Sequence, residues 1–268
     1  MRITAHSLAA PFMALALCAT AQAATVLKTV SRELDGSKES LTTVYAEGGK
    51  MRVETGGAND VVAVVFRDDA LYSFNAKDRT YYVMDRASMK KMADTVNPAL
   101  KQLQEQMAKM SPEQRAQMEK MMGGGKLPGM GGKEPVEEIR QTSRTSKAAG
   151  YSCTYAEMWQ DGVLVSEACV APMASIKGGQ ELADASVKIA ALMSDMLKEI
   201  DAPWLKQIAN RQVENFAKLG GVPVIGRTFS GGKPVREATL QSIASTAAPA
   251  GAFEVPAGYT RKEMMPQR

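Results

Sequence analysis

The side chains best suited to chemistry in this sequence are methionines, which recur at three-residue spacing in one central segment. The 268-residue chain contains 18 methionines, and Met107, Met110, Met118 and Met121 form two such pairs. Helical spacing places each pair on one face, and soft thioether sulfurs suit copper(I). Methionine also fills irregular apolar surfaces, so the same pairs are typical of packing or of an adaptable binding surface. We therefore predict no metal site and keep copper(I) at these four methionines as the alternative.

Histidine chemistry is excluded from almost the whole chain, because the single histidine is His6. This removes serine–histidine–acid triads and histidine metal sites. The glycine-rich stretch 123–132 does not match a phosphate-binding loop, since the lysine after its last glycine is followed by glutamate. The pair Asp68-Asp69 lies where a hairpin turn is needed, which indicates solvated surface rather than acid–base chemistry. We predict no catalytic residue, no cofactor and no enzyme.

Two cysteines lie in the best-specified hairpin of the sequence. Strand-like runs flank the loop 160–162, which ends in glycine. A three-residue loop pairs Trp159 with Val163, and counting outward places Cys153 opposite Cys169. The Cys-x-x-Cys spacing of redox-active pairs is absent, so we predict a structural disulfide formed in an oxidising compartment.

The first 23 residues are predicted to be a secretory signal peptide. A short basic start precedes the apolar run 8–19, and the tripeptide ending at Ala23 matches the small-residue cleavage pattern. The run is too short for a membrane span, so we expect a soluble periplasmic or secreted protein that begins at Ala24. Cys18 raises the alternative of a lipoprotein signal, but the preceding Leu17 is larger than that processing site requires.

The charge of the chain argues against one class of partner. Lysine and arginine number 33 against 29 acidic residues, a net charge of +4. This excess is small and spread along the chain, whereas nucleic-acid-binding domains concentrate basic residues in a patch or stripe. We therefore expect no nucleic-acid partner.

Residues 24–268 are predicted to form one α+β domain, a strongly curved, half-open antiparallel barrel of about eleven strands. Six short strand-like runs separated by turn residues precede Arg86, and five more follow the glycine-rich stretch. The continuous apolar run 61–66 predicts a strand that is covered on both faces. The segment 86–133 is predicted to be a methionine-rich helical and glycine-rich insertion.

Two helical segments carry apolar stripes that could face a ligand. In the insertion, Asn97 is expected to begin a helix through Met110, and Ser111 to begin a second one. The stripe of the first helix consists of Leu100, Leu103, Met107 and Met110. The segment 181–219 carries a second stripe that includes Leu192 and Met196. We predict that these six residues form an apolar lid or ligand-facing surface.

Three stretches resemble a known family. The first runs from Val65-Phe66-Arg67-Asp68-Asp69-Ala70-Leu71-Tyr72 through Asp78-Arg79-Thr80-Tyr81-Tyr82. The second is Ala149-Gly150-Tyr151-Ser152-Cys153 with Trp159-Gln160-Asp161-Gly162, and the third is Phe253-Glu254-Val255-Pro256-Ala257-Gly258-Tyr259. Their order resembles a family of secreted bacterial proteins of unknown function, whose architecture is similar to the outer-membrane lipoprotein carriers. The resemblance implies a half-open, eleven-stranded barrel with helices as a lid over an apolar cavity for acyl chains. The long insertion departs from the carriers.

These patterns together predict a periplasmic protein that binds a hydrophobic ligand, a lipid or acyl chain, without covalent chemistry. Transient contact with the membrane or an envelope protein is expected to accompany that role. One alternative is a copper(I)-binding or copper-stress protein that uses the methionine pairs. A weaker alternative is a holdase-like protein whose methionine-rich segment contacts unfolded clients.

Overall fold

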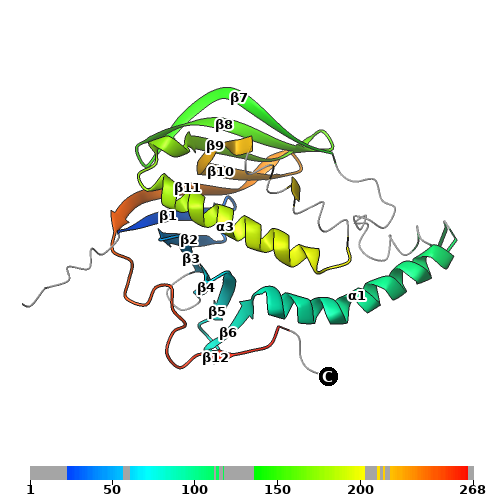
Figure 1. The fold of residues 1–268 in the computed structure, drawn as a ribbon. Helices are drawn as coiled ribbons and strands as arrows, with labels where there is room; N and C mark the ends of the chain where they lie inside the picture. Colours follow the sequence, from blue (N-terminus) through cyan, green and yellow to red (C-terminus); the bar gives the residue numbers. More distant parts are fainter. Residues whose placement is uncertain are drawn as a thin grey trace, which may run out of the picture.

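A large curved sheet with two helices on one face makes up most of the structure, a computed structural model (Figure 1). The structure describes residues 23–56, 61–111, 113–114, 117, 136–202, 210–211, 214 and 218–264. The strands are β1 (Ala24–Glu33), β2 (Glu39–Glu47), β3 (Lys50–Gly56), β4 (Val62–Arg67), β5 (Ala70–Asn75), β6 (Thr80–Met84), β7 (Glu137–Ala148), β8 (Tyr151–Gln160), β9 (Val163–Pro172), β10 (Gly221–Ser230), β11 (Lys233–Thr246) and β12 (Thr260–Arg261). The helices are α1 (Arg86–Lys109) and α3 (Gly179–Lys198), with a short 3-10 turn, η1 (Met173–Ser175).

The twelve strands follow the order β12-β6-β5-β4-β3-β2-β1-β11-β10-β9-β8-β7. Neighbours are antiparallel except β12, which runs parallel to β6. In the middle of the sheet β1 pairs with β11, and Ala24 lies opposite Thr246. The predicted curved sheet is present, and the short β12 adds a strand to the expected eleven. β7 and β12 stand at the two ends of this order, so the described sheet is not closed. Figure 1 shows that it is curved.

The sheet is covered on both faces at β4, as its continuous apolar sequence predicts. On the face that carries α1 and α3, Phe66 packs in a cluster with Met89, Leu192 and Met196. We call this the helix face. On the opposite face, Val65 packs with Phe253 and other residues of the segment that follows β11.

Residues 247–259, which we call the C-terminal strap, run from β11 across the face opposite the helices and lead into β12. Phe253 is buried against this face, and the rings of Tyr259 and Phe74 meet almost at right angles with a centroid distance of 6.0 Å. Two arginines of the sheet hold the strap: Arg52 donates to the carbonyl of Ala252 at 2.8 Å, and Arg67 pairs with Glu254. The strap therefore returns the end of the chain to β6.

Helix α1 begins eleven residues earlier than predicted, at Arg86 instead of Asn97. Asp85 caps it: its carboxylate accepts from the Ser88 N–H at 2.7 Å, and the Ser88 hydroxyl accepts from the Asp85 N–H. Asn97 instead joins the helices, donating to the Glu199 carbonyl at 3.0 Å and accepting from the Asp201 N–H at 2.8 Å. The predicted second helix start is present, because Ser111 and Gln114 exchange the two hydrogen bonds of a capping box.

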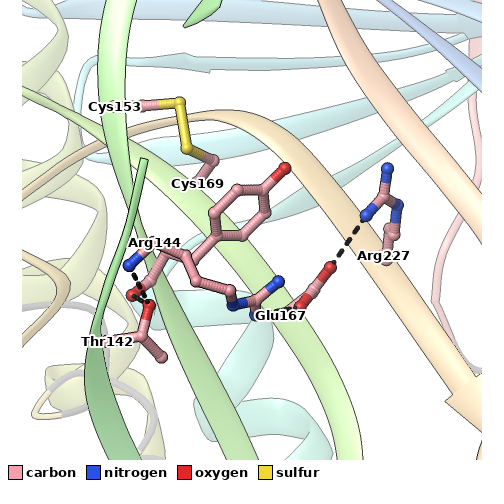
Figure 2. The surroundings of a disulfide bond; sticks show 7 residues. Thr142, Arg144, Cys153, Glu167, Cys169 and Arg227 are labelled. Atoms are coloured by element: carbon pink, nitrogen blue, oxygen red, sulfur yellow. Dashed lines mark hydrogen bonds and ion pairs between the residues drawn. A yellow bond between two sulfur atoms is a disulfide. The ribbon is translucent and has the colours of Figure 1, made fainter. Parts of the chain in front are cut away.

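The disulfide between Cys153 and Cys169 is confirmed, with a Cα–Cα distance of 5.3 Å (Figure 2). The predicted register was wrong by one residue. Asp161 and Gly162 both have positive φ, so they form a two-residue hairpin turn that pairs Gln160 with Val163. A bulge then shifts the register again, and the residue opposite Cys169 is Tyr155. The two cysteines therefore lie diagonally across β8 and β9.

Several predicted features lie outside the described residues. They are most of the signal peptide with His6 and Cys18, the glycine-rich stretch 123–132, and much of the segment 203–217. In the part of the chain that the structure describes, no helix is long and apolar enough to cross a membrane.

Candidate ligand-binding groove

A groove of about 920 Å³ lies between α1, β6 and the residues that follow β12. Its apolar wall consists of Val83, Met92, Val96, Ala99, Leu100, Leu103 and Met264. The volume falls within the range of about 300–1,000 Å³ that is typical of small-molecule sites. This groove is the candidate functional site, because it combines size with a mainly apolar lining.

Charged side chains border the apolar wall. Lys91 of α1, Arg261 of β12 and the following Lys262 and Glu263 all line the groove and are exposed to solvent. Three positive charges against one negative charge give this rim a positive balance. The groove therefore offers an apolar interior beside a basic border.

Helix α1 supplies one side of the groove because its lining residues recur at three- and four-residue steps. Lys91, Thr95, Ala99 and Leu103 follow one another along a single face of the helix. The same helix buries Met89 and Ala93 against the core on its other side. The groove is thus lined by the part of α1 that the sheet does not cover.

The end of the chain supplies the other side through its pairing with β6. The Thr260 N–H donates to the Arg79 carbonyl at 2.9 Å, and the Lys262 N–H donates to the Tyr81 carbonyl at 2.8 Å. These backbone bonds fix the position of residues 261–264 along the groove. The C-terminal strap delivers these residues, so the groove depends on the strap being bound to the sheet.

Asp85 sits at the start of α1, next to the basic border. Burial would raise the pKa of its carboxyl, but hydrogen bonds from the N–H and hydroxyl of Ser88 and the charge of Arg261 together lower the pKa below its usual value. The carboxylate is therefore ionised at neutral pH, where it caps the helix and attracts Arg261.

The six residues predicted to face a ligand divide into three groups. Leu100 and Leu103 line the groove. Leu192 and Met196 of α3 are only 8% and 1% exposed and pack into the core, so the structure does not bring them to the groove. Met110 is half-buried just beyond α1, and Met107 lies within α1.

Methionines form much of the core beneath the groove. The buried cluster around Phe66 contains Met89 and Met196, and further methionines pack against it. These further residues are Met51, Met84, Met92, Met193 and Met264. Met92 and Met264 belong to both the cluster and the groove wall, so flexible thioether side chains connect the core to the groove.

Of the four methionines considered as copper(I) ligands, two lie outside the residues that the structure describes: Met118 and Met121. Among the residues that are described, no group of three or more His, Cys, Asp and Glu side chains could hold a metal ion. Packing accounts for the methionines of the core around Phe66.

A second polar cluster lies next to the disulfide, on the five strands β7 to β11. Glu167 lies between Arg144 and Arg227 (Figure 2). It is 6% exposed and accepts from Arg144 at 2.6 Å and from Arg227 at 3.1 Å. Arg144 also pairs with Glu157, and Arg227 pairs with Glu237. Each charge in this cluster has an opposite partner, which indicates that the cluster joins neighbouring strands and is not an open binding site.

The sequence predictions missed the basic residues of the groove. Lys91 lies far in the sequence from Arg261 and Lys262, and the pairing of β12 with β6 brings these two residues to the groove beside α1. The signal that could have found them is the apolar, proline-containing segment 253–259. If such a segment packs on the sheet, the residues directly after it are placed there as well.

Comparisons with known proteins identify no family for this chain. No protein-family model and no curated protein matches the chain. An uncharacterized conserved protein from Thermus thermophilus is similar in structure, with a TM-score of 0.43, 9% sequence identity and 90% of each chain covered. A structure of PNGF-II is similar with a TM-score of 0.37 and 9% identity, covering 90% of this chain and 31% of that one.

Proposed function

We propose that this protein binds a hydrophobic ligand, a lipid or acyl chain, in the groove along α1. The observation that carries the proposal is the groove of about 920 Å³ with its wall of valine, leucine and methionine side chains. Burying ten methylene groups would contribute about 8 kcal/mol before the entropic costs of association. A net binding free energy of about 8 kcal/mol corresponds to a micromolar Kd. An acyl chain longer than ten methylene groups can therefore reach this affinity without a covalent bond to the protein.

In this proposal α1 acts as the movable wall of the site. Its polar connections to α3 are the exposed Arg86–Asp195 pair and the bridge made by Asn97. Exposed ion pairs contribute little, so separation of the helices is opposed mainly by the packing of Met89 and its neighbours. The α1 helix is thus the part that would move to admit a chain.

The proposed location is the periplasm or the extracellular medium. The disulfide between Cys153 and Cys169 supports an oxidising compartment, where such bonds persist. The predicted signal peptide, with cleavage near Ala23, supports export of the chain. A carrier of hydrophobic molecules in that compartment would meet the membrane or an envelope protein to load and release its ligand.

The first test measures lipid binding to the whole protein. Native mass spectrometry of protein released gently from the periplasm should show co-purifying lipid, and the delipidated protein should bind cis-parinaric acid. Leu103→Glu places a charge in the apolar wall, so we expect at least tenfold weaker binding of this probe. Circular dichroism and the melting temperature check that the variant is folded.

The matched control is Val187→Glu, which makes the same kind of change on α3 at a side chain that is 68% exposed. Its affinity for the probe should stay within twofold of the unsubstituted protein. Protein that carries no lipid and binds no probe would contradict the proposed function. Equal binding by the Leu103→Glu and Val187→Glu variants would remove the groove as the site.

A further inference from the structure

The basic residues around the groove differ from Arg144 and Arg227 of the sheet because no described carboxylate forms a close ion pair with them. In the described part of the chain, no ion pair within 4.0 Å involves Lys91, Arg261 or Lys262. Arg144 and Arg227, by contrast, each contact two carboxylates at 3.1 Å or less. The groove therefore has positive charges available for a ligand.

These charges come from opposite sides of one apolar wall. Lys91 projects from α1, whereas Arg261 and Lys262 belong to the segment that β6 holds. The carboxylates nearby are Glu263 in the lining and Asp85, whose charge interacts with Arg261. Even when Asp85 is counted with Glu263, three positive charges stand against two negative ones, so the balance at the groove remains positive.

The hydroxyl groups of the lining do not change this balance. Ser88 donates to the Asp85 carbonyl at 3.0 Å, and Thr95 donates to the Lys91 carbonyl at 3.3 Å. Both hydroxyl groups therefore donate their hydrogen bonds to backbone carbonyls at or near the start of α1. Lys91, Arg261 and Lys262 remain the groups at the groove that suit a negatively charged partner.

The apolar wall extends from these charges along the helix. From Lys91 to Leu103 the helical rise gives a length of about 18 Å. The residues over this distance include Val96, Ala99 and Leu100. An extended acyl chain can lie along this wall while a group at its end remains beside Lys91.

We propose that the groove selects anionic amphiphiles, with the negative headgroup held between Lys91, Arg261 and Lys262 and the chain lying along α1. This inference rests on the proposed function and adds the chemical class of the ligand. The headgroup chemistry is that of a carboxylate or a phosphate, and a free fatty acid or a phospholipid could supply it. Because the cations are partly exposed, their attraction for the headgroup should weaken as salt is added.

The test compares ligands that share one acyl chain and differ in charge. Oleate and oleoyl lysophosphatidate are anionic, monoolein is neutral, and each is measured by displacement of cis-parinaric acid from the whole protein in 50 mM and 500 mM salt. We expect oleate to bind at least tenfold more tightly than monoolein at low salt, and this ratio to fall at high salt. Tighter binding of lysophosphatidate than oleate would indicate a phospholipid as the source of the headgroup.

Substitutions then test the three cations. The double variant Lys91→Gln with Lys262→Gln should lose at least fivefold in affinity for oleate and keep its affinity for monoolein. Arg261→Gln should act in the same direction. The control Lys233→Gln removes an exposed charge at the β10–β11 turn, which is not part of the groove lining, and should change neither affinity.

The outcomes separate this inference from the proposed function. Equal binding of oleate and monoolein, unchanged in the double variant, would overturn charge selection and leave the hydrophobic site intact. Failure of every ligand to bind would overturn both. Loss of monoolein binding in the double variant would show that the lysines support the groove structure, and this would also overturn the selection of charge.

Discussion

Glu167 is the single charged residue that is buried in the described part of the chain. Its carboxylate joins β9 to β7 through Arg144 and to β10 through Arg227. The hydrogen bond with Glu167 is the main reason why the pKa of Arg144 is raised, while Arg227 has a raised pKa chiefly because of Glu237 and then because of Glu167. One buried carboxylate thus connects three strands near the disulfide.

We predict that Glu167→Gln lowers the free energy of unfolding by about 2 kcal/mol, because two charge-assisted hydrogen bonds are weakened at a buried site. Urea denaturation followed by circular dichroism measures this loss. Glu138→Gln is the matched control, since Glu138 pairs with Arg140 on the surface and its removal should not change the midpoint. A Glu167→Gln midpoint equal to that of the control would show that the cluster does not stabilise the fold.

At the scale of single elements, the strands were predictable and the start of α1 was not. In the part of the chain before α1, short strand-like runs are separated by turn residues, and the apolar side chains of these runs pack in the core. For α1, two local signals competed. Asn97-Pro98 reads as a helix start, but Asp85-x-x-Ser88 supplies the cap that is used, and Asn97 is engaged by the end of α3 instead.

The β8–β9 hairpin shows a second limit of sequence reasoning. The cysteine pairing was predicted correctly from a register that was wrong by one residue at the turn and by two residues at the cysteines. Asp161 adopts a positive φ, which converts the expected three-residue loop into a two-residue turn, and the bulge after Met158 shifts the strands again. A diagonal pair on one face still reaches disulfide distance, so the prediction tolerated the error.

Asp85 allows a direct test of the helix start. We predict that Asp85→Ala lowers the free energy of unfolding by about 1 kcal/mol at pH 7, because the first turn of α1 loses its cap. Since the folded-state pKa of Asp85 is lowered, its ionised form stabilises the protein above the unfolded pKa of about 3.9, and this contribution is lost as the pH falls through the folded pKa.

Urea denaturation of the Asp85→Ala variant at several pH values measures both effects. Its deficit relative to the unsubstituted protein should be complete above about pH 5 and shrink below about pH 4. Asp85→Asn serves as the control, because asparagine caps helices without titrating in this range. A deficit that stays constant down to pH 3 would contradict the assigned role of the ionised carboxylate.

At the scale of the whole molecule, the C-terminal strap connects the two faces of the sheet. It covers β4 and β5 on one face and then leads into the residues Arg261, Lys262 and Met264, which line the groove beside α1. This explains why the fold could be predicted well and the groove only in part. Leu100 and Leu103 were recognisable from helical spacing, but their partners come from the other end of the chain.

The pairing of β1 with β11 has a consequence for the order in which the protein folds. Ala24 and Thr246 must meet to join the two halves of the sheet, so this central contact closes the longest loop among the paired strands. The β8–β9 hairpin needs only a two-residue turn. Contacts that are local in sequence form with less loss of chain entropy, so the middle of the finished sheet should be one of the last parts to form.

Pulsed hydrogen exchange during refolding, with the disulfide kept intact, tests this order. Amides shared between β8 and β9 should become protected first, and those shared between β1 and β11 should follow in a slower phase. Protection of β1 and β11 before the hairpin would contradict the expected order. If the order holds, a partly folded chain has an unpaired edge at β1 until β11 pairs with it. The protein should therefore aggregate most readily during that interval.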